Sequence, residues 1–168
     1  MAFHLYLMRH AKSDWAVPGT SDFDRPINKR GNKSAIRIGE WMAENKHIPE
    51  KIISSPAIRA KQTIELVVDQ IDSKSENEIS YEEDLYLASL DTLLENIQLY
   101  KNDVNSLMLV AHNPGLEDLV HFLSSQSSYE YKSMTTANLV IFEYKNNKFD
   151  VGMDKGKFVE FIKPKELD

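Results

Sequence analysis

Three short segments of the sequence carry arginine and histidine side chains suited to binding an anion. Arg9 and His10 follow one apolar run, His112 follows another, and Arg59 lies four residues after Ser55. Arginine is permanently charged and grips phosphate or carboxylate oxygens through paired N–H donors. Histidine changes charge near pH 7, so it can act as a nucleophile, a proton donor or a metal ligand. These residue types therefore suit chemistry on a small anion.

Each segment stands where a predicted strand ends. Apolar periodicity predicts strands at residues 4–8, 51–54, near 79, 107–111, 139–144 and 158–162, and helices at 33–45, 57–71, 90–97 and 116–123. This alternation, with a β-rich C-terminal end, predicts a three-layer α/β/α sandwich around a mainly parallel sheet. Ligands of such sheets bind beyond the carboxyl ends of the strands, so we expect the three segments to converge there.

Two of the segments carry signals for the start of a helix. Ser55 and Asn113 are good N-cap residues, and each is followed by proline, which suits the first helical position. Helices that begin there would point their N-termini, which attract anions, at the crevice. Arg59 in a first turn opposes the helix dipole by roughly 0.3–1 kcal/mol, which makes sense if it faces an anion.

Each feature also has a purely structural explanation. Arg9 and Arg59 could be solvated surface residues, and a histidine after a buried strand is often hydrogen-bonded structure. A metal site at His10 and His112 has little support, because no histidine pair shows metal-ligand helical spacing such as H-E-x-x-H. Neither G-x-G-x-x-G nor G-x-x-x-x-G-K occurs, which removes the dinucleotide and P-loop interpretations.

Composition limits the class of protein. The 168 residues suit one domain spanning 1–168, and the absence of cysteine removes disulfides, thiolate nucleophiles and cysteine metal sites. Twenty basic residues against 26 acidic ones, a formal charge of −6, argue against a nucleic-acid partner. No apolar run of about 18 residues and no secretory signal is present, so we expect no membrane partner and a cytoplasmic protein.

The motifs resemble those of the histidine phosphatase superfamily, which includes cofactor-dependent phosphoglycerate mutase. The matching segments are Leu7–Ser13, Ser54–Thr63 and Val110–Pro114, and further segments resemble the small SixA-like phosphohistidine phosphatases: Asp22–Ile27, Lys29–Gly31 and Pro164–Leu167. Ala11 departs from the pattern, because the superfamily usually has glycine there. The resemblance implies a phosphoglycerate mutase-like fold.

The resemblance also implies roles for five residues. His10 would be the nucleophile, and His112 would stabilise charge in the transition state. Arg9, Arg59 and Arg25 would bind the phosphoryl oxygens, with no metal and no cofactor. Nearby fixed cations should keep His10 neutral, and its second ring nitrogen needs a carbonyl or carboxylate partner.

The proton donor is not placed by the motifs. Larger members of the superfamily carry a catalytic carboxylate on a helical lid, for which the stretch 82–87 has no room. Glu82, Glu83 and Asp84 are the nearby candidates for that role.

A phosphohistidine substrate has a better leaving group than an alkyl phosphate, and a crevice without a lid admits a protein surface. We therefore expect a metal-independent phosphatase that works through an enzyme phosphohistidine and acts on phosphohistidine of a protein. The alternatives are a phosphatase for small phosphorylated metabolites and a non-catalytic phosphate-binding module. A mutase is disfavoured, because that activity usually needs an enclosed site.

Overall fold

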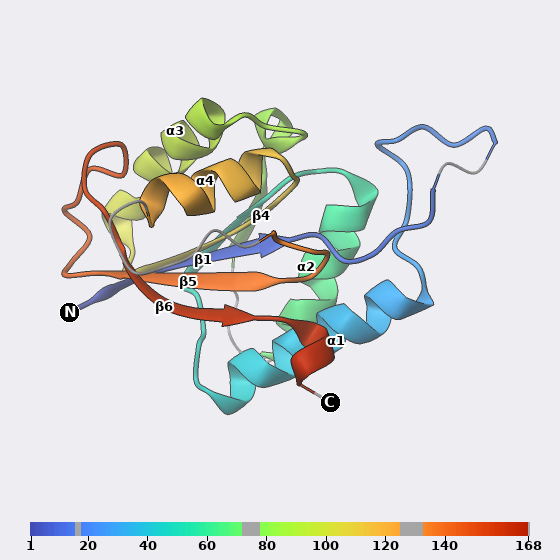
Figure 1. Ribbon diagram of the computed structural model, residues 1–168, viewed down its shortest axis with the longest axis horizontal. Coiled ribbons are helices and arrows are strands. Elements are labelled where there is room, and N and C mark those ends of the chain that lie inside the picture. The colour runs from blue at the N-terminus through green and yellow to red at the C-terminus, as the bar shows by residue number, and fades with distance from the viewer. Residues whose placement is uncertain (16–17, 72–77, 125–132, 168) are drawn as a thin grey trace.

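A six-stranded sheet runs through the middle of the protein, with helices on both faces (Figure 1). The computed structural model describes residues 1–15, 18–71, 78–124 and 133–167. The strands are β1 (Phe3–Arg9), β2 (Lys51–Ser54), β3 (Glu78–Tyr81), β4 (Ser106–Ala111), β5 (Leu139–Tyr144) and β6 (Lys157–Ile162). The α-helices are α1 (Lys29–Glu44), α2 (Ile58–Gln70), α3 (Leu90–Tyr100) and α4 (Gly115–Leu123), and short 3-10 turns span Glu83–Leu85, Lys101–Asp103 and Pro164–Glu166.

The strand order in the sheet is β3-β2-β4-β1-β5-β6. Along the chain, strands are added toward one edge of the sheet up to β3 and toward the other edge from β4 onward. The first four strands pair in parallel, whereas β5 is antiparallel to both β1 and β6. Parallel strands need crossover connections, which α1, α2 and α3 supply between β1, β2, β3 and β4. The helix α4 leads from β4 into the antiparallel strand β5, and β5 and β6 are joined directly. The predicted mainly parallel sheet with a β-rich C-terminal end is confirmed.

The two faces of the sheet bury two separate apolar cores. Alternate residues of β1 point to opposite faces: Phe3, Leu5 and Leu7 pack with α3 and α4, while Tyr6 and Met8 pack with α1 and α2. Figure 1 shows the corresponding helix pairs on opposite sides of the sheet. All six residues of β4 are buried, as the uninterrupted apolar run predicts for a central strand.

The first helix begins earlier than the sequence predicts. The expected start at residue 33 is wrong, because the side chain of Asn28 caps the helix by accepting a hydrogen bond from the Gly31 amide at 2.8 Å. The amide of Asn28 also donates to the carbonyl of Lys12 at 2.9 Å. The start of α1 is thereby attached to the loop that follows β1.

Among the described residues, we find no helix with the length and apolar character needed to cross a bilayer.

Gly31 allows the close approach of α1 to the loop after β1, so its replacement should destabilise the protein. A Cβ at this position would lie 2.3 Å from the carbonyl oxygen of Lys12 and 3.2 Å from the side chain of Ile27. We expect Gly31→Ala to reduce the free energy of unfolding in urea by about 1–3 kcal/mol, because the backbone of α1 or of the loop must move. Lys33→Ala, on the exposed face of the same helix, should change it by less than about 0.5 kcal/mol. Equal stability of the two variants would contradict this packing argument.

Candidate active site

The three segments meet at the carboxyl edge of three adjacent strands. Arg9 ends β1 and His10 follows it, His112 follows β4, and Arg59 comes from the first turn of α2 after β2. The ring centroids of His10 and His112 lie 5.1 Å apart, and Nη2 of Arg59 lies 3.4 Å from Nδ1 of His112. The structure therefore brings together side chains that lie up to about a hundred residues apart in the sequence.

His10 is buried with one ring nitrogen held by the backbone. Its Nδ1 lies 2.8 Å from the carbonyl oxygen of Ala11, which can only accept a hydrogen bond. The neutral ring therefore carries its proton on Nδ1, and Nε2 keeps its lone pair. This is the carbonyl partner that the sequence analysis requires for a nucleophilic histidine.

Burial and positive charge keep His10 neutral. Burial is the main cause that lowers its pKa to about 4, and the nearby charges of Arg59, Arg9 and Arg25 lower it further, against a smaller opposing effect of the Ala11 hydrogen bond. His112 is buried beside the same arginines, and its pKa is lowered to about 3, again mainly by burial. Both imidazoles are uncharged near pH 7.

His112 is held between two polar partners. Its Nε2 lies 2.7 Å from the hydroxyl oxygen of Ser55, and its Nδ1 faces Arg59. Because a guanidinium nitrogen can only donate, Nδ1 acts as the acceptor and Nε2 donates its proton to Ser55. A serine hydroxyl can rotate to donate instead, which would move the ring proton to the Nδ1 side.

Ser55 and Asn113 do not cap helices as predicted. The N-cap residues are Ala57 for α2 and Pro114 for α4, so α2 begins two residues later, and α4 one residue later, than caps at Ser55 and Asn113 predict. The hydroxyl of Ser55 is bonded to His112, and the amide of Asn113 donates to Glu117 at 2.9 Å and to the Met134 carbonyl at 2.8 Å. The Ser55 hydroxyl also accepts a hydrogen bond from the Ala57 amide at 3.2 Å, so it contacts both the start of α2 and His112.

The buried Arg59 and the half-buried Arg9 keep donors that are unused within the described residues. Arg59 is 2% exposed, and its Nη1 donates to the backbone carbonyl of Asp22 at 2.6 Å. Nη1 of Arg9 donates to the carbonyl of Met134 at 3.0 Å. The Nε atoms of Arg9 and Arg59 are buried without a hydrogen-bond partner in the described structure. Unsatisfied buried donors on two cations fit a site for an anion.

Arg25 lies at the rim, where its donors are taken by the surrounding loop. Its Nη1 donates to the Ser13 hydroxyl at 2.9 Å and to the Asp14 carbonyl at 2.8 Å, and its Nε donates to Asp22 at 3.1 Å. Its charge nevertheless contributes to lowering the pKa of His10. The structure thus places Arg25 near the other four residues, with contacts that shape the loop.

The acidic candidates for a proton donor lie away from the two histidines. Glu82 accepts a hydrogen bond from the hydroxyl of Tyr100 on α3, and Glu83 is exposed at the start of a 3-10 turn. Asp84 accepts a hydrogen bond from Asn96 at 3.1 Å. Within the described residues we find no contact of these carboxylates with His10 or His112.

Two further residues face the site, although the sequence alone assigned them no role. Asp22 accepts hydrogen bonds from Arg59 Nη2 at 3.1 Å and from the hydroxyl of Tyr86. The ring of Tyr86 stands edge-on to that of His112, with centroids 5.5 Å apart. Asp22 opens one of the SixA-like segments, and Tyr86 lies within the stretch 82–87, so the sequence marked both regions without separating these residues from their neighbours.

Asp22 is the ionised counter-charge of this cluster. The hydrogen bond from Tyr86 is the largest cause that lowers the pKa of the carboxyl to about 2, and Arg59 and Arg25 add to it against a smaller cost of burial. Among the described residues, no group of three or more histidine, aspartate or glutamate side chains is arranged to hold a metal ion.

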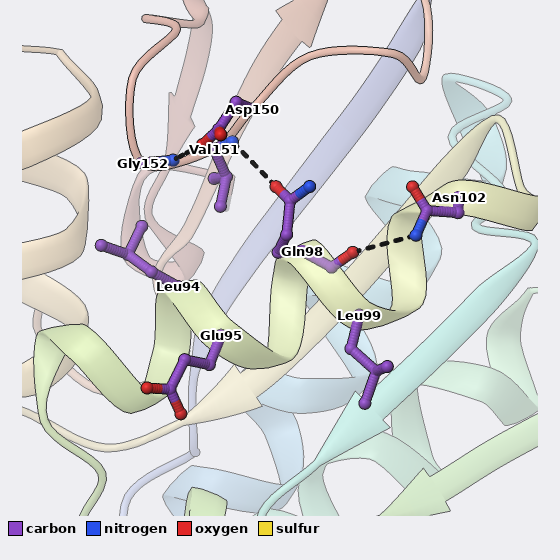
Figure 2. A pocket seen from close by; sticks show the side chains of 8 residues that line it. All are labelled: Leu94, Glu95, Gln98, Leu99, Asn102, Asp150, Val151 and Gly152. Carbon is purple, nitrogen blue, oxygen red and sulfur yellow. Dashed lines mark hydrogen bonds between the residues drawn. The ribbon is translucent and has the colours of Figure 1, made fainter.

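A separate groove of about 530 Å³ lies along the C-terminal half of α3 (Figure 2). It is closed on one side by the β5–β6 connection, where the amide of Val151 donates to Gln98 Oε1 at 3.1 Å. Since β5 ends beside the start of β1, this groove lies at the opposite edge of the sheet from His10 and His112. The groove is therefore separate from the candidate active site.

Comparison with known proteins agrees with this geometry. Residues 5–86 match the family model of the histidine phosphatase superfamily, branch 1. An uncharacterized protein of Mycobacterium tuberculosis is 37% identical over 121 residues, which cover 71% of this chain and 72% of that protein. The chain belongs to the histidine phosphatase superfamily.

Other relatives of the superfamily are similar over more of the chain. A crystal structure of a candidate phosphohistidine phosphatase SixA from Agrobacterium tumefaciens has a TM-score of 0.81 and 28% identity, covering 95% of this chain and 97% of that one. A phosphohistidine phosphatase SixA homolog of Haemophilus influenzae is 24% identical over 170 residues, or 95% of this chain and 99% of that protein. The chain spans 66% of the length of another relative, from Arabidopsis thaliana. The expected phosphoglycerate mutase-like fold is confirmed.

Acid should destabilise the protein through His10 and His112. Their pKa values, about 4 and about 3 in the folded protein, lie below the ordinary value of 6.5, so the unfolded chain takes up protons at a higher pH than the folded chain. Their contribution to stability is therefore fully present above about pH 6.5 and is lost as the pH falls toward 4 and 3. In urea unfolding, each histidine should lower the free energy of unfolding by up to about 1.4 kcal/mol per pH unit in this window.

The matched control is the double variant His10→Gln/His112→Gln. It should show a shallower loss of stability between about pH 6.5 and pH 4, while the contribution of His47, whose pKa is also lowered, stays the same in both proteins. Asp22, with its pKa of about 2, acts mainly below this window. Identical slopes for the variant and the unaltered protein would contradict the assignment.

Proposed function

We propose that the protein is a phosphatase that forms a covalent phosphohistidine on His10. The observation that carries this proposal is the state of the His10 ring, which is buried and neutral with its proton held on Nδ1 by Ala11. A lone pair on Nε2 next to unsatisfied arginine donors supplies a nucleophile and a binding site for the group it attacks. Membership of the histidine phosphatase superfamily supports the same chemistry.

Binding of the phosphoryl group depends on Arg9 and Arg59. Their buried Nε atoms lack partners within the described structure, and an incoming phosphoryl group would satisfy both. Arg25 adds positive charge from the rim. We propose that these three guanidinium groups provide the charge neutralisation of a metal-independent reaction.

The reaction proceeds in two displacements. In the first, Nε2 of His10 attacks phosphorus and the bond to the leaving group breaks. The phosphorylated ring becomes positively charged, and its Nδ1–H continues to donate to the carbonyl of Ala11. In the second, water attacks phosphorus, the P–N bond breaks with its electron pair returning to His10, and the protons of the water leave with the inorganic phosphate. His112 stabilises the phosphoryl oxygens when Ser55 donates to Nε2 and the ring proton lies on Nδ1.

The proposed substrate is phosphohistidine on a protein. Glu82 and Glu83 remain the sequence-based candidates for a proton donor, although Glu82 is hydrogen-bonded to Tyr100. Asp22 is ionised and cannot supply a proton near pH 7. A substrate that leaves as imidazole needs less help from an acid than an alcohol does. The A. tumefaciens and H. influenzae relatives are both named as phosphohistidine phosphatases, which supports this substrate class.

Trapping of the intermediate tests the proposed function. After acid-free quenching of a reaction with labelled substrate, we expect an acid-labile, base-stable phosphoryl group on His10, located by mass spectrometry. His10→Ala should lose at least about 10³-fold in activity, as expected when a nucleophile is removed. His121→Ala, an exposed histidine on α4, should keep full activity. Phosphatase activity retained by His10→Ala would contradict the mechanism, and a phosphate-binding module would bind phosphate without forming any labelled protein.

Ser55 should affect rate more than binding. Ser55→Ala removes the hydroxyl that sets the proton position of His112, so we expect kcat to fall by about tenfold to a hundredfold with little change in KM. Ser55→Thr keeps the hydroxyl and should recover most of the rate. Equal activity of the alanine variant and the unaltered protein would remove Ser55 from the mechanism.

A further inference from the structure

We propose that Asp22 accepts a hydrogen bond from the far ring nitrogen of a phosphohistidine substrate, so that the substrate ring leaves as neutral imidazole. This inference rests on the proposed function and assigns a substrate-selecting residue to it. Asp22 has a side chain 49% exposed, whereas His10 is 6% exposed and Arg59 2%. In an in-line displacement the leaving group lies on the side of phosphorus opposite His10. We place that side at the exposed rim, where the Asp22 carboxylate contacts Arg59.

The contacts of Asp22 suit an acceptor and not an acid. Oδ1 accepts from Arg25 Nε at 3.1 Å, and Oδ2 accepts from Arg59 Nη2 at 3.1 Å and from the Tyr86 hydroxyl. These donors stabilise the carboxylate, whose lowered pKa keeps it ionised near pH 7. A carboxylate can accept about four hydrogen bonds in total, through two lone pairs on each oxygen.

Phosphoryl binding would open a place on this carboxylate. Nη2 of Arg59 donates to Asp22 and also faces His112, so it lies at the border between the rim and the buried histidines. When Nη2 turns to a phosphoryl oxygen, Oδ2 of Asp22 loses one donor. The far ring N–H of the substrate can then donate to the lone pair of Oδ2 that Arg59 has left.

The chemistry of the leaving group explains why that N–H matters. In phosphohistidine one ring nitrogen is bonded to phosphorus, and the far nitrogen can carry a proton. As Nε2 of His10 bonds to phosphorus, the substrate P–N bond breaks and its electron pair returns to the substrate ring. With the far nitrogen protonated the ring leaves as neutral imidazole, and without that proton it would leave as an anion. A neighbouring carboxylate favours the protonated ring.

His10 itself provides a parallel within the structure. Its Nδ1 proton is held by the Ala11 carbonyl at 2.8 Å, which favours the same protonated form once Nε2 carries the phosphoryl group. Asp22 would do for the substrate ring what Ala11 does for the enzyme ring. The phosphoryl group would then pass between two imidazoles that each carry a proton on the nitrogen not bonded to phosphorus. A phosphate ester has no far N–H, so Asp22 would give it no such assistance.

The test compares two substrates in Asp22→Asn, which keeps one acceptor oxygen near Arg59 but removes the charge. With a chemically phosphorylated histidine peptide, we expect kcat/KM to fall about tenfold to a hundredfold, the effect of losing one charge-assisted hydrogen bond. With p-nitrophenyl phosphate, whose leaving group needs no proton, kcat/KM should change by less than about threefold. Asp24→Asn, an exposed carboxylate two residues along the same loop, should leave both substrates unchanged.

The other outcomes separate the inference from the proposed function. Equal losses on both substrates would mean that Asp22 only positions Arg59, and no loss on the peptide would mean that it plays no part; either result overturns the inference. If the unaltered protein hydrolyses p-nitrophenyl phosphate but not the peptide, the proposed substrate class is wrong and this inference is overturned with it. If it hydrolyses neither substrate, the proposed phosphatase activity is wrong.

Discussion

The concentration of buried positive charge at one edge of the sheet is the constraint on which the rest of the site depends. Arg59 is buried and Arg9 half-buried beside it, and Asp22 is the ionised carboxylate that contacts Arg59 directly. Such an arrangement costs free energy unless an anion or a counter-charge compensates it. The burial that makes the site costly also makes it selective, because electrostatic interactions strengthen where water is excluded.

The same constraint determines the state of the two imidazoles. A histidine beside fixed cations in a buried place is neutral, so the arginines proposed to bind an anion would also keep His10 able to attack it. The backbone carbonyl of Ala11 then decides which nitrogen is available. Binding and nucleophilicity therefore come from one arrangement, in which Arg9 and His10 are adjacent in sequence at the end of a single strand.

Much of this arrangement was predictable, for reasons that particular residues illustrate. The buried strand 107–111 and the motif residues Arg9, His10, Arg59 and His112 followed from apolar runs and from the family motifs, which are local in sequence. The start of α1 and the N-cap residues of α2 and α4 were not, because they depend on distant partners. Ser55 looks like an N-cap residue in isolation, but His112 takes its hydroxyl, and Asn28 caps α1 while it also contacts the loop after β1.

The sequence by itself determined the alternation of strands and helices, the residue types at the strand ends and the family to which the chain belongs, since all three are written in short spacings and composition. Only the tertiary structure decided that Asp22 and Tyr86 join Arg59 and His112, and that Glu82 is bonded to Tyr100. The physical reason is that a hydrogen bond between side chains is made or lost by differences of a few tenths of an ångström in the distance between segments far apart in the chain. Those distances are set by how the helices pack on the sheet, which no local pattern specifies.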